Sequence, residues 1–269
     1  MTTNAFTDIA EGLIIDHVFR TATWAKPANL YLGLMSAVTN GETSTFTELS
    51  GGSYARVQKT PGATDFNIVG NVATNAGYVT FPNPTGAQGT ATHIGIWDAS
   101  VNGNLLVYSQ LNAPVTIAAG GPPLAFAPNA FSFTYNGKTT AFSNLIISFL
   151  FGSATWAKPT SLNFDLMTTA PTAAGGGVVC NAASYAAVNV ACSDSNFSST
   201  WRTSGNGTTS NANNITFPVP GEAWGGILAA RIVDNTGLFI TWAEFAPQSI
   251  GLGYNAPYIA AGAATWSIN

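Results

Sequence analysis

The side chains that could carry out chemistry in this chain are few and isolated. His17 and His93 are the only histidines among 269 residues. A histidine titrates near neutral pH, so each is a candidate general base or metal ligand. The chain has no Gly-x-Ser-x-Gly nucleophile elbow, no His-Glu-x-x-His pair and no phosphate loop. We therefore expect His17 on the polar side of a first helix and His93 in a strand, with no catalytic residue at either place.

Two carboxylates occur at matching positions of an internal repeat. Asp98 and Asp234 each lie beside Asn and Gly residues. They could be paired acids or calcium ligands, but an aspartate in such a setting usually hydrogen-bonds the backbone of a turn. Gln110 and Glu244 also match, and since only one of them titrates, they predict no shared general acid.

The two cysteines leave two alternatives open. Cys180 and Cys192 lie in the second half of the chain and have no counterparts in the first. They could pair across a local hairpin, or remain as two separate buried thiols in a protein made under reducing conditions. Two cysteines and two distant histidines cannot build a zinc site, so we expect neither a metal nor a cofactor.

A six-residue repeat determines the expected domain organisation. The sequence Ala-Thr-Trp-Ala-Lys-Pro occurs at residues 22–27 and again at 154–159, so Trp24 and Trp156 are 132 positions apart (156 − 24). The length of the chain also suits two domains of about 130 residues, each with its own core. We predict two copies of one fold, at residues 1–137 and 138–269.

Each copy is predicted to open with a helix. Residues 8–11 have the spacing of a capping box led by Asp8, and apolar residues then recur at helical intervals up to Phe19. The matching segment, residues 145–151, has Phe149 in place of His17 and is apolar nearly all round. A helix without a polar face is usually covered on every side, so we place the second helix at the junction of the two domains.

The rest of each copy reads as short strands. Positions 30, 32 and 34 and their counterparts 162, 164 and 166 are apolar in both copies, whereas Tyr31 and Gly33 become Asn163 and Asp165, which indicates a strand with one core face. Hairpins are expected around residues 98–104 and 234–237. An insertion within residues 192–214, which contains Trp201 and Arg202, is expected to be an exposed loop. The pattern predicts a mainly β protein of two tandem β-sandwich, jelly-roll-like domains, each with a short N-terminal helix.

Composition excludes several classes of function. Charged residues make up only 7% of the chain, the net charge is −4 and no basic run occurs, so nucleic-acid binding is not expected. The longest apolar run, residues 145–151, is too short to span a bilayer, and the first ten residues do not resemble a secretory signal. We expect a protein made in the cytoplasm, with a charge-poor surface suited to permanent neighbours.

The aromatic residues raise sugar binding as a second class of function. Seven tryptophans in a charge-poor β protein could stack on carbohydrate rings, and the residues to test are Trp97, Trp201, Trp224 and Trp242. Trp24 and Trp156 occupy one repeat position, just before the core strand. They are expected to fill the core of each domain.

A series of motifs in the first half resembles a family of tailed-bacteriophage virion proteins, often labelled tail-fibre-like. The motifs are Leu-Tyr-Leu-Gly-Leu-Met at 30–35, Ser-Gly-Gly-Ser-Tyr-Ala-Arg at 50–56, Val-Thr-Phe-Pro at 79–82, Thr-His-Ile-Gly-Ile-Trp-Asp at 92–98 and Gly-Asn-Leu-Leu at 103–106. The second half matches more loosely: it lacks the arginine after Tyr-Ala and has Arg231 to Asp234 where the family has His-x-Gly-Ile-x-Asp.

The resemblance implies a non-enzymatic virion component. Two positions in a virion compete. A head decoration or cement protein would bind the major capsid protein and copies of itself, most simply as a homotrimer; we favour it because the chain lacks heptads, shaft repeats and a long linker. The alternative is a tail fibre or tail adaptor that binds tail proteins and, as a further role, host-surface glycans.

Overall fold

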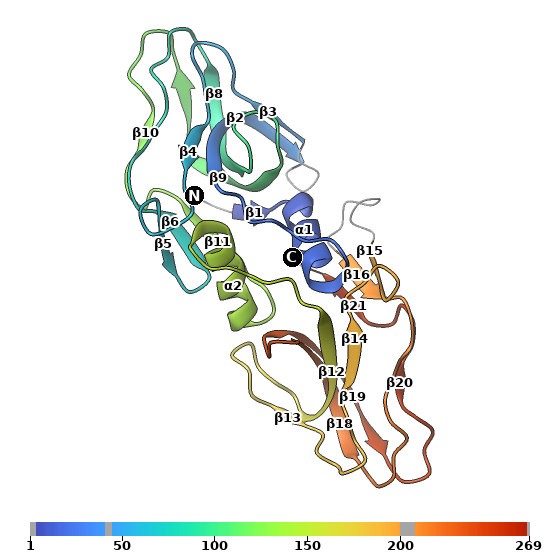
Figure 1. The fold of residues 1–269 in the computed structure, drawn as a ribbon. Helices are drawn as coiled ribbons and strands as arrows, with labels where there is room; N and C mark the ends of the chain where they lie inside the picture. The colour runs from blue at the N-terminus through green and yellow to red at the C-terminus, as the bar shows by residue number, and fades with distance from the viewer. Residues whose placement is uncertain (1–3, 41–44, 200–207, 268–269) are drawn as a thin grey trace.

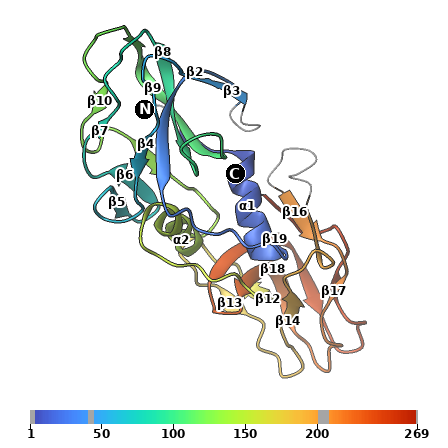
Figure 2. The ribbon, with the colours of Figure 1, turned by 45° about the horizontal axis from the view of Figure 1, so that its top comes forward.

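The computed structural model describes residues 4–40, 45–199 and 208–267, and for Asn4 and Ala5 the backbone only. The protein is mainly β and consists of two repeated halves, each of which starts with a short helix (Figure 1). The sheets of the two halves lie at opposite ends of an elongated molecule, with both helices between them (Figures 1 and 2).

The first half contains one large sheet and two small ones, all antiparallel in the pairs they form. The large sheet has the order β1-β9-β8-β2-β3, and β4 also pairs with β2; the small sheets are β11-β6-β5 and β10-β7. The strands are β1 (Asn4–Phe6), β2 (Leu30–Asn40), β3 (Thr45–Glu48), β4 (Val57–Lys59), β5 (Phe66–Val69), β6 (Val72–Asn75), β7 (Val79–Thr80), β8 (Gly89–Trp97), β9 (Leu105–Ile117), β10 (Ala125–Phe126) and β11 (Ser132–Thr134).

Within its described residues, the second half repeats this plan with one strand fewer in the large sheet. Its large sheet has the order β13-β12-β18-β19, with β14 paired to β12, and its small sheets are β15-β16-β21 and β17-β20. The strands are β12 (Ser161–Thr169), β13 (Val178–Val179), β14 (Val188–Ala191), β15 (Phe197–Ser199), β16 (Thr208–Asn211), β17 (Ile215–Thr216), β18 (Gly225–Asp234), β19 (Phe239–Ile250), β20 (Tyr258–Ile259) and β21 (Thr265–Ser267).

The core face predicted for the first long strand is confirmed, whereas its other face, predicted to meet water or a partner, is covered by the protein itself. Leu30, Leu32 and Leu34 of β2 are fully buried in the main core. The opposite face of β2 is also covered, because Met35 joins Trp97 and Leu105 in a second, smaller cluster. The corresponding strand β12 likewise buries Leu162, Phe164 and Leu166.

Both helices begin at a threonine. In α1 (Asp8–Phe19), the Thr7 side chain accepts a hydrogen bond from the Ala10 amide, so Thr7 is the N-cap and the expected cap at Asp8 is wrong by one residue. In α2 (Thr140–Phe151), Thr139 caps in the same way through the Phe142 amide. A side-chain oxygen at this position satisfies one of the free amides of the first turn.

The two helices pack across the junction in a reciprocal manner. Helix α1 contacts β1 and β9 of its own half and also β15 and β16 of the second half, whereas α2 contacts β19 of its own half and β5 and β6 of the first. The predicted position of the second helix at the junction is therefore confirmed. The first helix shares that position, and the buried apolar residues of both halves form one continuous core.

Aromatic side chains at the end of each helix pack against the opposite half. The Phe19 ring at the end of α1 lies 5.4 Å from the Phe197 ring and 5.1 Å from the Trp266 ring, measured between ring centroids, and both partners belong to the β15-β16-β21 sheet of the second half. Phe151 at the end of α2 lies 5.2 Å from Phe66 and 5.3 Å from Phe133, both in the small sheet of the first half. Each helix thus completes the core of the opposite half.

The repeated tryptophans lie at this junction. Trp24 and Trp156 are buried as expected, but Trp24 packs edge-on against Phe149 of α2, at 5.2 Å between ring centroids. The Trp156 ring lies 4.2 Å from the His17 ring. The expectation that His17 lies on a polar helix side is wrong: the side chain is fully buried, because the second half covers that side of α1.

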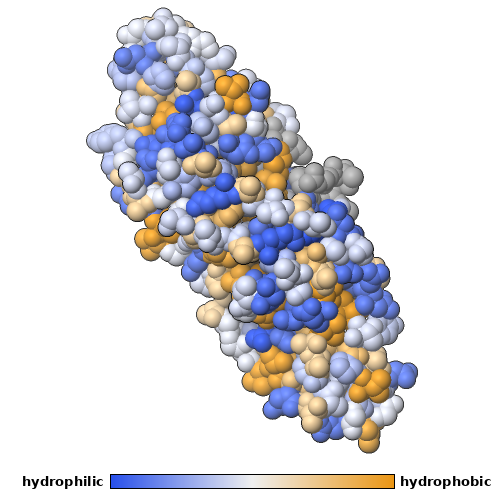
Figure 3. Space-filling model, in the orientation of Figure 1, coloured by the Kyte–Doolittle hydropathy of each residue, from blue (hydrophilic) through white to orange (hydrophobic). Residues whose placement is uncertain are grey.

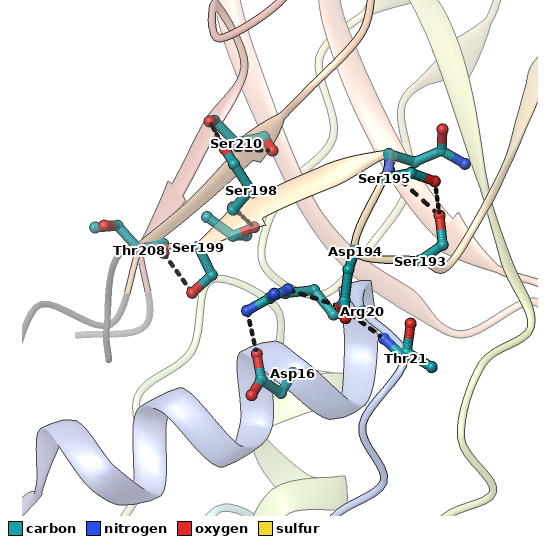
Figure 4. Close-up of polar contacts among 12 residues, drawn as sticks. Asp16, Arg20, Thr21, Ser193, Asp194, Ser195, Ser198, Ser199, Thr208 and Ser210 are labelled. Atoms are coloured by element: carbon teal, nitrogen blue, oxygen red, sulfur yellow. Dashed lines mark hydrogen bonds and ion pairs between the residues drawn. The ribbon is translucent and has the colours of Figure 1, made fainter. Parts of the chain in front are cut away.

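Polar contacts also join the halves. Arg20 lies between Asp16 of its own helix, at 3.2 Å, and Asp194 of the second half, at 3.0 Å (Figure 4). Asp194 also accepts a hydrogen bond from the Thr21 amide. On the other side, the Lys26 ammonium donates to the carbonyls of Gly152 and Ala154, just after α2. Each helix end is therefore held by a residue of the opposite half.

The surface and the cysteines can be compared with expectation. Apolar side chains are exposed in several separate patches along both halves (Figure 3). The most exposed large apolar side chains include Val69, Val101 and Leu252, which are 79, 73 and 73% exposed. Cys180 and Cys192 are free thiols rather than a disulfide, one buried and one half-buried. Within the described ranges, no helix is long and apolar enough to cross a bilayer.

Candidate functional site

The two histidines lie in structural positions. Nδ1 of His17 accepts a hydrogen bond from the Trp24 amide at 3.0 Å. Burial, together with the positive charge of Lys158, lowers the pKa of His17 to about 4, while a backbone contact with Trp156 opposes this shift. His93 is half-buried in β8, its Nδ1 lies 2.8 Å from the Thr92 hydroxyl, and burial lowers its pKa. Neither imidazole belongs to a group of three potential metal ligands among the described residues.

The matched aspartates form turns, as predicted. Oδ1 of Asp98 accepts a hydrogen bond from the Asn104 amide at 2.7 Å and closes the β8–β9 hairpin. Oδ1 of Asp234 accepts from the amides of Thr236 and Leu238, at 2.8 and 2.9 Å, in the β18–β19 hairpin. Both carboxylates are therefore used to hold tight turns.

Gln110 and Glu244 do not meet each other or an acidic partner. Gln110 is exposed on β9 opposite His93. Glu244 is exposed on β19, where it accepts a hydrogen bond from the Trp242 indole at 3.3 Å. The two positions lie in the separate large sheets of the two halves.

The four tryptophans considered for sugar stacking have different environments. Trp97 is fully buried, and Trp224 is 4% exposed with its indole N–H bonded to the Ser184 hydroxyl at 2.9 Å. Trp201 lies outside the described residues. Trp242 is half-buried on β19, and the Lys138 ammonium lies over its ring at 4.7 Å. Trp97 and Trp224 thus present no free ring face to a sugar.

Motif residues of the first half gather around Trp97. Arg56 donates two hydrogen bonds to the Glu48 carboxylate, at 2.8 and 2.7 Å, and two more to the carbonyls of Ala99 and Asn102, both at 2.7 Å. Its guanidinium carbon lies 4.1 Å from the centroid of the Trp97 ring. Because all three guanidinium nitrogens are engaged by the protein, this cluster braces the outer face of the sheet and is a structural feature.

The second half replaces this cluster with a different one. The pair Gly33 and Gly95, directly opposite each other on β2 and β8, is replaced by Asp165 and Arg231 on β12 and β18. Arg231 donates to Asp165 at 2.8 Å. The loose match of the second half to the Trp-Asp motif therefore has a structural cause: a cross-strand ion pair occupies the space that the tryptophan ring takes in the first half.

A cavity in the second half lies between residues of the large sheet and residues of the small sheets. It has a volume of about 370 Å³, and its lining includes Phe164 of β12, Thr241 of β19, Ala264 before β21 and Trp266 of β21. Phe245, 40% exposed, and Lys138, exposed, stand at its border. We call this cavity the β19 pocket.

The β19 pocket corresponds to solid core in the first half. The equivalent positions follow from shared contacts: Ala230 and Thr241 occupy the strand registers of Ile94 and Val107. The Ala264 amide donates to the Asn211 side chain as the Phe131 amide donates to the Asn75 side chain, so Ala264 corresponds to Phe131. Lys138 corresponds to Phe6, because each directly precedes the threonine that caps its helix. All four first-half residues are at most 5% exposed. Four large apolar side chains have thus been replaced by smaller or polar ones, which opens the pocket.

The sequence analysis does not predict this pocket. The positions that reveal the repeat, such as the tryptophans and the Thr-Phe-Pro motifs, are those that match between the copies. The signal lies in the positions that do not match, where a core residue of one copy becomes alanine, threonine or lysine in the other.

Comparison with known families gives a match that covers nearly the whole chain. The family model described as "Podophage GP4 fiber I protein gp80" matches residues 5–134 and again residues 137–267. No curated protein matches the chain significantly. The chain therefore belongs to this family of phage fibre proteins, as two tandem copies. The expected resemblance to tail-fibre-like virion proteins is confirmed, and the family favours the fibre alternative over the head decoration protein, which we preferred because the chain lacks heptads, shaft repeats and a long linker.

Proposed function

We propose that this member of the podophage fibre family is a structural component of a tail fibre, without enzymatic activity. The observation that carries the proposal is the match of both halves to one family of fibre proteins. The candidate chemical groups support it, because the aspartates close turns and His17 is buried at the junction. Its role is to present rigid β domains within the fibre.

We infer that the protein works in contact with tail proteins and with copies of itself. The exposed apolar side chains and the low content of charged residues support permanent contacts, since an isolated soluble protein usually carries more interspersed charge. A homotrimer is the simplest assembly of this kind. Multi-angle light scattering of the purified protein at micromolar concentration checks self-association, and a monomer at every concentration would contradict it.

We also propose a sandwich-like arrangement within each half, with the large sheet facing the small sheets across the core. The β19 pocket supports this arrangement, because its lining comes from β12, β18 and β19 on one side and from β20 and β21 on the other. The three sheets per half differ from the two sheets of a simple sandwich.

The position in the virion can be tested on purified particles. Quantitative mass spectrometry gives the copy number relative to the major capsid protein, and immunogold labelling gives the site. A tail fibre predicts a ratio one to two orders of magnitude below that of the capsid protein, with gold at the tail. Labelling of the head surface at a ratio near that of the capsid protein would refute the proposal.

A further inference from the structure

The outer edge of the large sheet is closed in the first half and open in the second. In the first half, β1 pairs with β9, and Asn4, Ala5 and Phe6 lie opposite Ser109, Tyr108 and Val107. In the second half, β19 pairs with β18 only, within the described ranges. The registers place Thr241, Trp242 and Ala243 where β9 receives β1. An open edge presents backbone donors and acceptors to any incoming strand.

The chain itself holds away the segment that would close this edge. By position in the repeat, the counterpart of β1 is residues 136–138. The residues just before it belong to the first half, where Ser132–Thr134 pair with β6. The side chain of Asn71 binds the Tyr135 carbonyl at 2.9 Å and the Asn136 amide oxygen at 3.0 Å. The linker is thus fixed to the first half at Tyr135 and Asn136. Beyond this point Lys138 lies over the Trp242 ring and the Thr139 hydroxyl donates to the Phe239 carbonyl of β19, so an incoming strand has to displace the Lys138 side chain.

The open edge borders the β19 pocket. Thr241, Trp242, Ala243 and Phe245 belong both to β19 and to the pocket lining. In the first half, the residue opposite Val107 is Phe6, whose ring is 5% exposed and lies edge-on to Tyr135 at 5.1 Å. The second half therefore lacks both the closing strand and its aromatic side chain, and a cavity remains beside the edge.

We propose that β19 receives an extended strand from another protein chain, and that this strand inserts one aromatic side chain into the β19 pocket. The strand would run antiparallel to β19 over Thr241, Trp242 and Ala243, as β1 does on β9. Main-chain hydrogen bonds would supply affinity, and the pocket would select the aromatic residue. Since the pocket lining is mainly apolar, the inserted segment should be uncharged, like Asn-Ala-Phe in β1.

A saccharide fits the same place less well. The Trp266 ring is stacked on Phe19, with ring centroids 5.1 Å apart and planes 17° apart, so that face is already covered. One face of Trp242 is covered by Lys138. Sugar stacking needs an open aromatic face, whereas an inserted phenyl ring needs an apolar cavity between two layers.

The test uses the full chain and a peptide that copies its own β1, Thr-Thr-Asn-Ala-Phe-Thr. Binding is measured by isothermal titration calorimetry, and hydrogen exchange identifies the protected amides. We expect binding with protection of residues 241–243, and at least about tenfold weaker binding of the peptide in which serine replaces phenylalanine. The inference does not depend on the tail location, because it is tested on purified protein.

A matched pair of variants examines the pocket. Ala264→Phe restores the residue of the first half and should weaken peptide binding by at least about tenfold. Ala119→Phe, at an exposed position of the first half, should leave binding unchanged. Should Ala264→Phe not fold, the proposal is still tested on the unmodified protein by comparing the phenylalanine and serine peptides and by the amides protected from hydrogen exchange. Equal binding of both peptides, protection at residues 107–109 instead, no binding at millimolar peptide, or binding of a screened saccharide in its place would overturn the proposal.

Discussion

At the scale of single residues, His17 acquires its properties from the opposite half of the molecule. Its ring is fully buried against Trp156 and Phe149, at 4.2 and 6.3 Å between centroids, and it accepts the Trp24 amide. Burial disfavours the charged imidazolium, and nearby Lys158 adds to this, which is why the pKa of His17 falls to about 4. The neutral ring is the form that the folded protein accommodates.

This low pKa predicts a loss of stability in mild acid. Between pH 6.5 and 4 the unfolded chain binds a proton at His17 while the folded protein does not, so the free energy of unfolding falls as the pH falls. A shift from 6.5 to about 4 corresponds to at most about 3 kcal/mol, fully lost near pH 4. Urea unfolding at pH 7, 5.5 and 4 measures it.

The variants His17→Asn and His93→Asn separate this contribution from other titrating groups. Asparagine keeps an acceptor for the Trp24 amide but has no proton to bind in this range. The loss between pH 7 and 4 should shrink by roughly 2–3 kcal/mol in His17→Asn. His93 is half-buried, so His93→Asn should keep most of the loss. An identical pH dependence in the wild type and His17→Asn would disprove the assignment.

At the scale of elements, Gly33 and Gly95 leave room for the Trp97 ring to pack against the large sheet of the first half. A Cβ at Gly95 would lie 2.6 Å from Leu105 Cδ1 and 2.8 Å from Trp97 Cη2. A Cβ at Gly33 would lie 2.7 Å from Trp97 Cζ3. The positions of the Trp97 ring and of Arg56, which lies over that ring, therefore require residues without a Cβ at both glycine positions.

Gly95→Ala should therefore destabilise the protein by about 1–3 kcal/mol, because two packed side chains must move. Gly226, on the equivalent strand β18, has open space at its Cβ position. We expect Gly226→Ala to change stability by no more than about 0.5 kcal/mol. Urea denaturation midpoints of the two variants make the comparison, and equal effects would contradict the packing argument.

The elements themselves were largely predictable, because their signals are local. Apolar alternation in β2, turn residues at Asp98 and Asp234 and the apolar α2 each have a direct physical meaning along the chain. The burial of His17 was not predictable, since the residues that cover it are more than 130 positions away. The β19 pocket was missed for a related reason: it depends on Lys138, Thr241 and Ala264 together, and none of them carries a signal singly.

At the scale of the whole molecule, the two halves depend on each other's helices. Phe151 of α2 packs on Phe66 and Phe133, so the first half obtains part of its core from residues 138–269. Phe19 of α1 packs on Phe197 and Trp266 and does the same for the second half. A sequence repeat would suggest two units that fold independently, whereas these contacts predict that folding is coupled.

Coupling can be measured in the intact chain by hydrogen exchange. Phe151→Ala removes a fully buried ring, and such truncations cost about 3–5 kcal/mol. That ring packs against Phe66 and Phe133 in the small sheet of the first half. Amide hydrogen exchange should therefore accelerate in β5 and β6, although the substitution lies in the second repeat. The control Phe217→Ala removes a ring that is 2% exposed and packs on Tyr185 within the second half. It should accelerate exchange around β17 and leave β5 and β6 protected.

Separated halves extend the same reasoning. Fragments 1–137 and 138–269 expressed together should purify as a one-to-one complex, because each supplies the helix that covers the other's small sheet. Expressed singly, each fragment would expose the aromatic residues that the missing helix covers, and neither should unfold cooperatively as a monomer. A monomeric 1–137 fragment with a cooperative transition and fully protected β5 and β6 would show that the exchanged helix is dispensable. In that case the two halves would be domains that fold independently, and the junction would only hold them together.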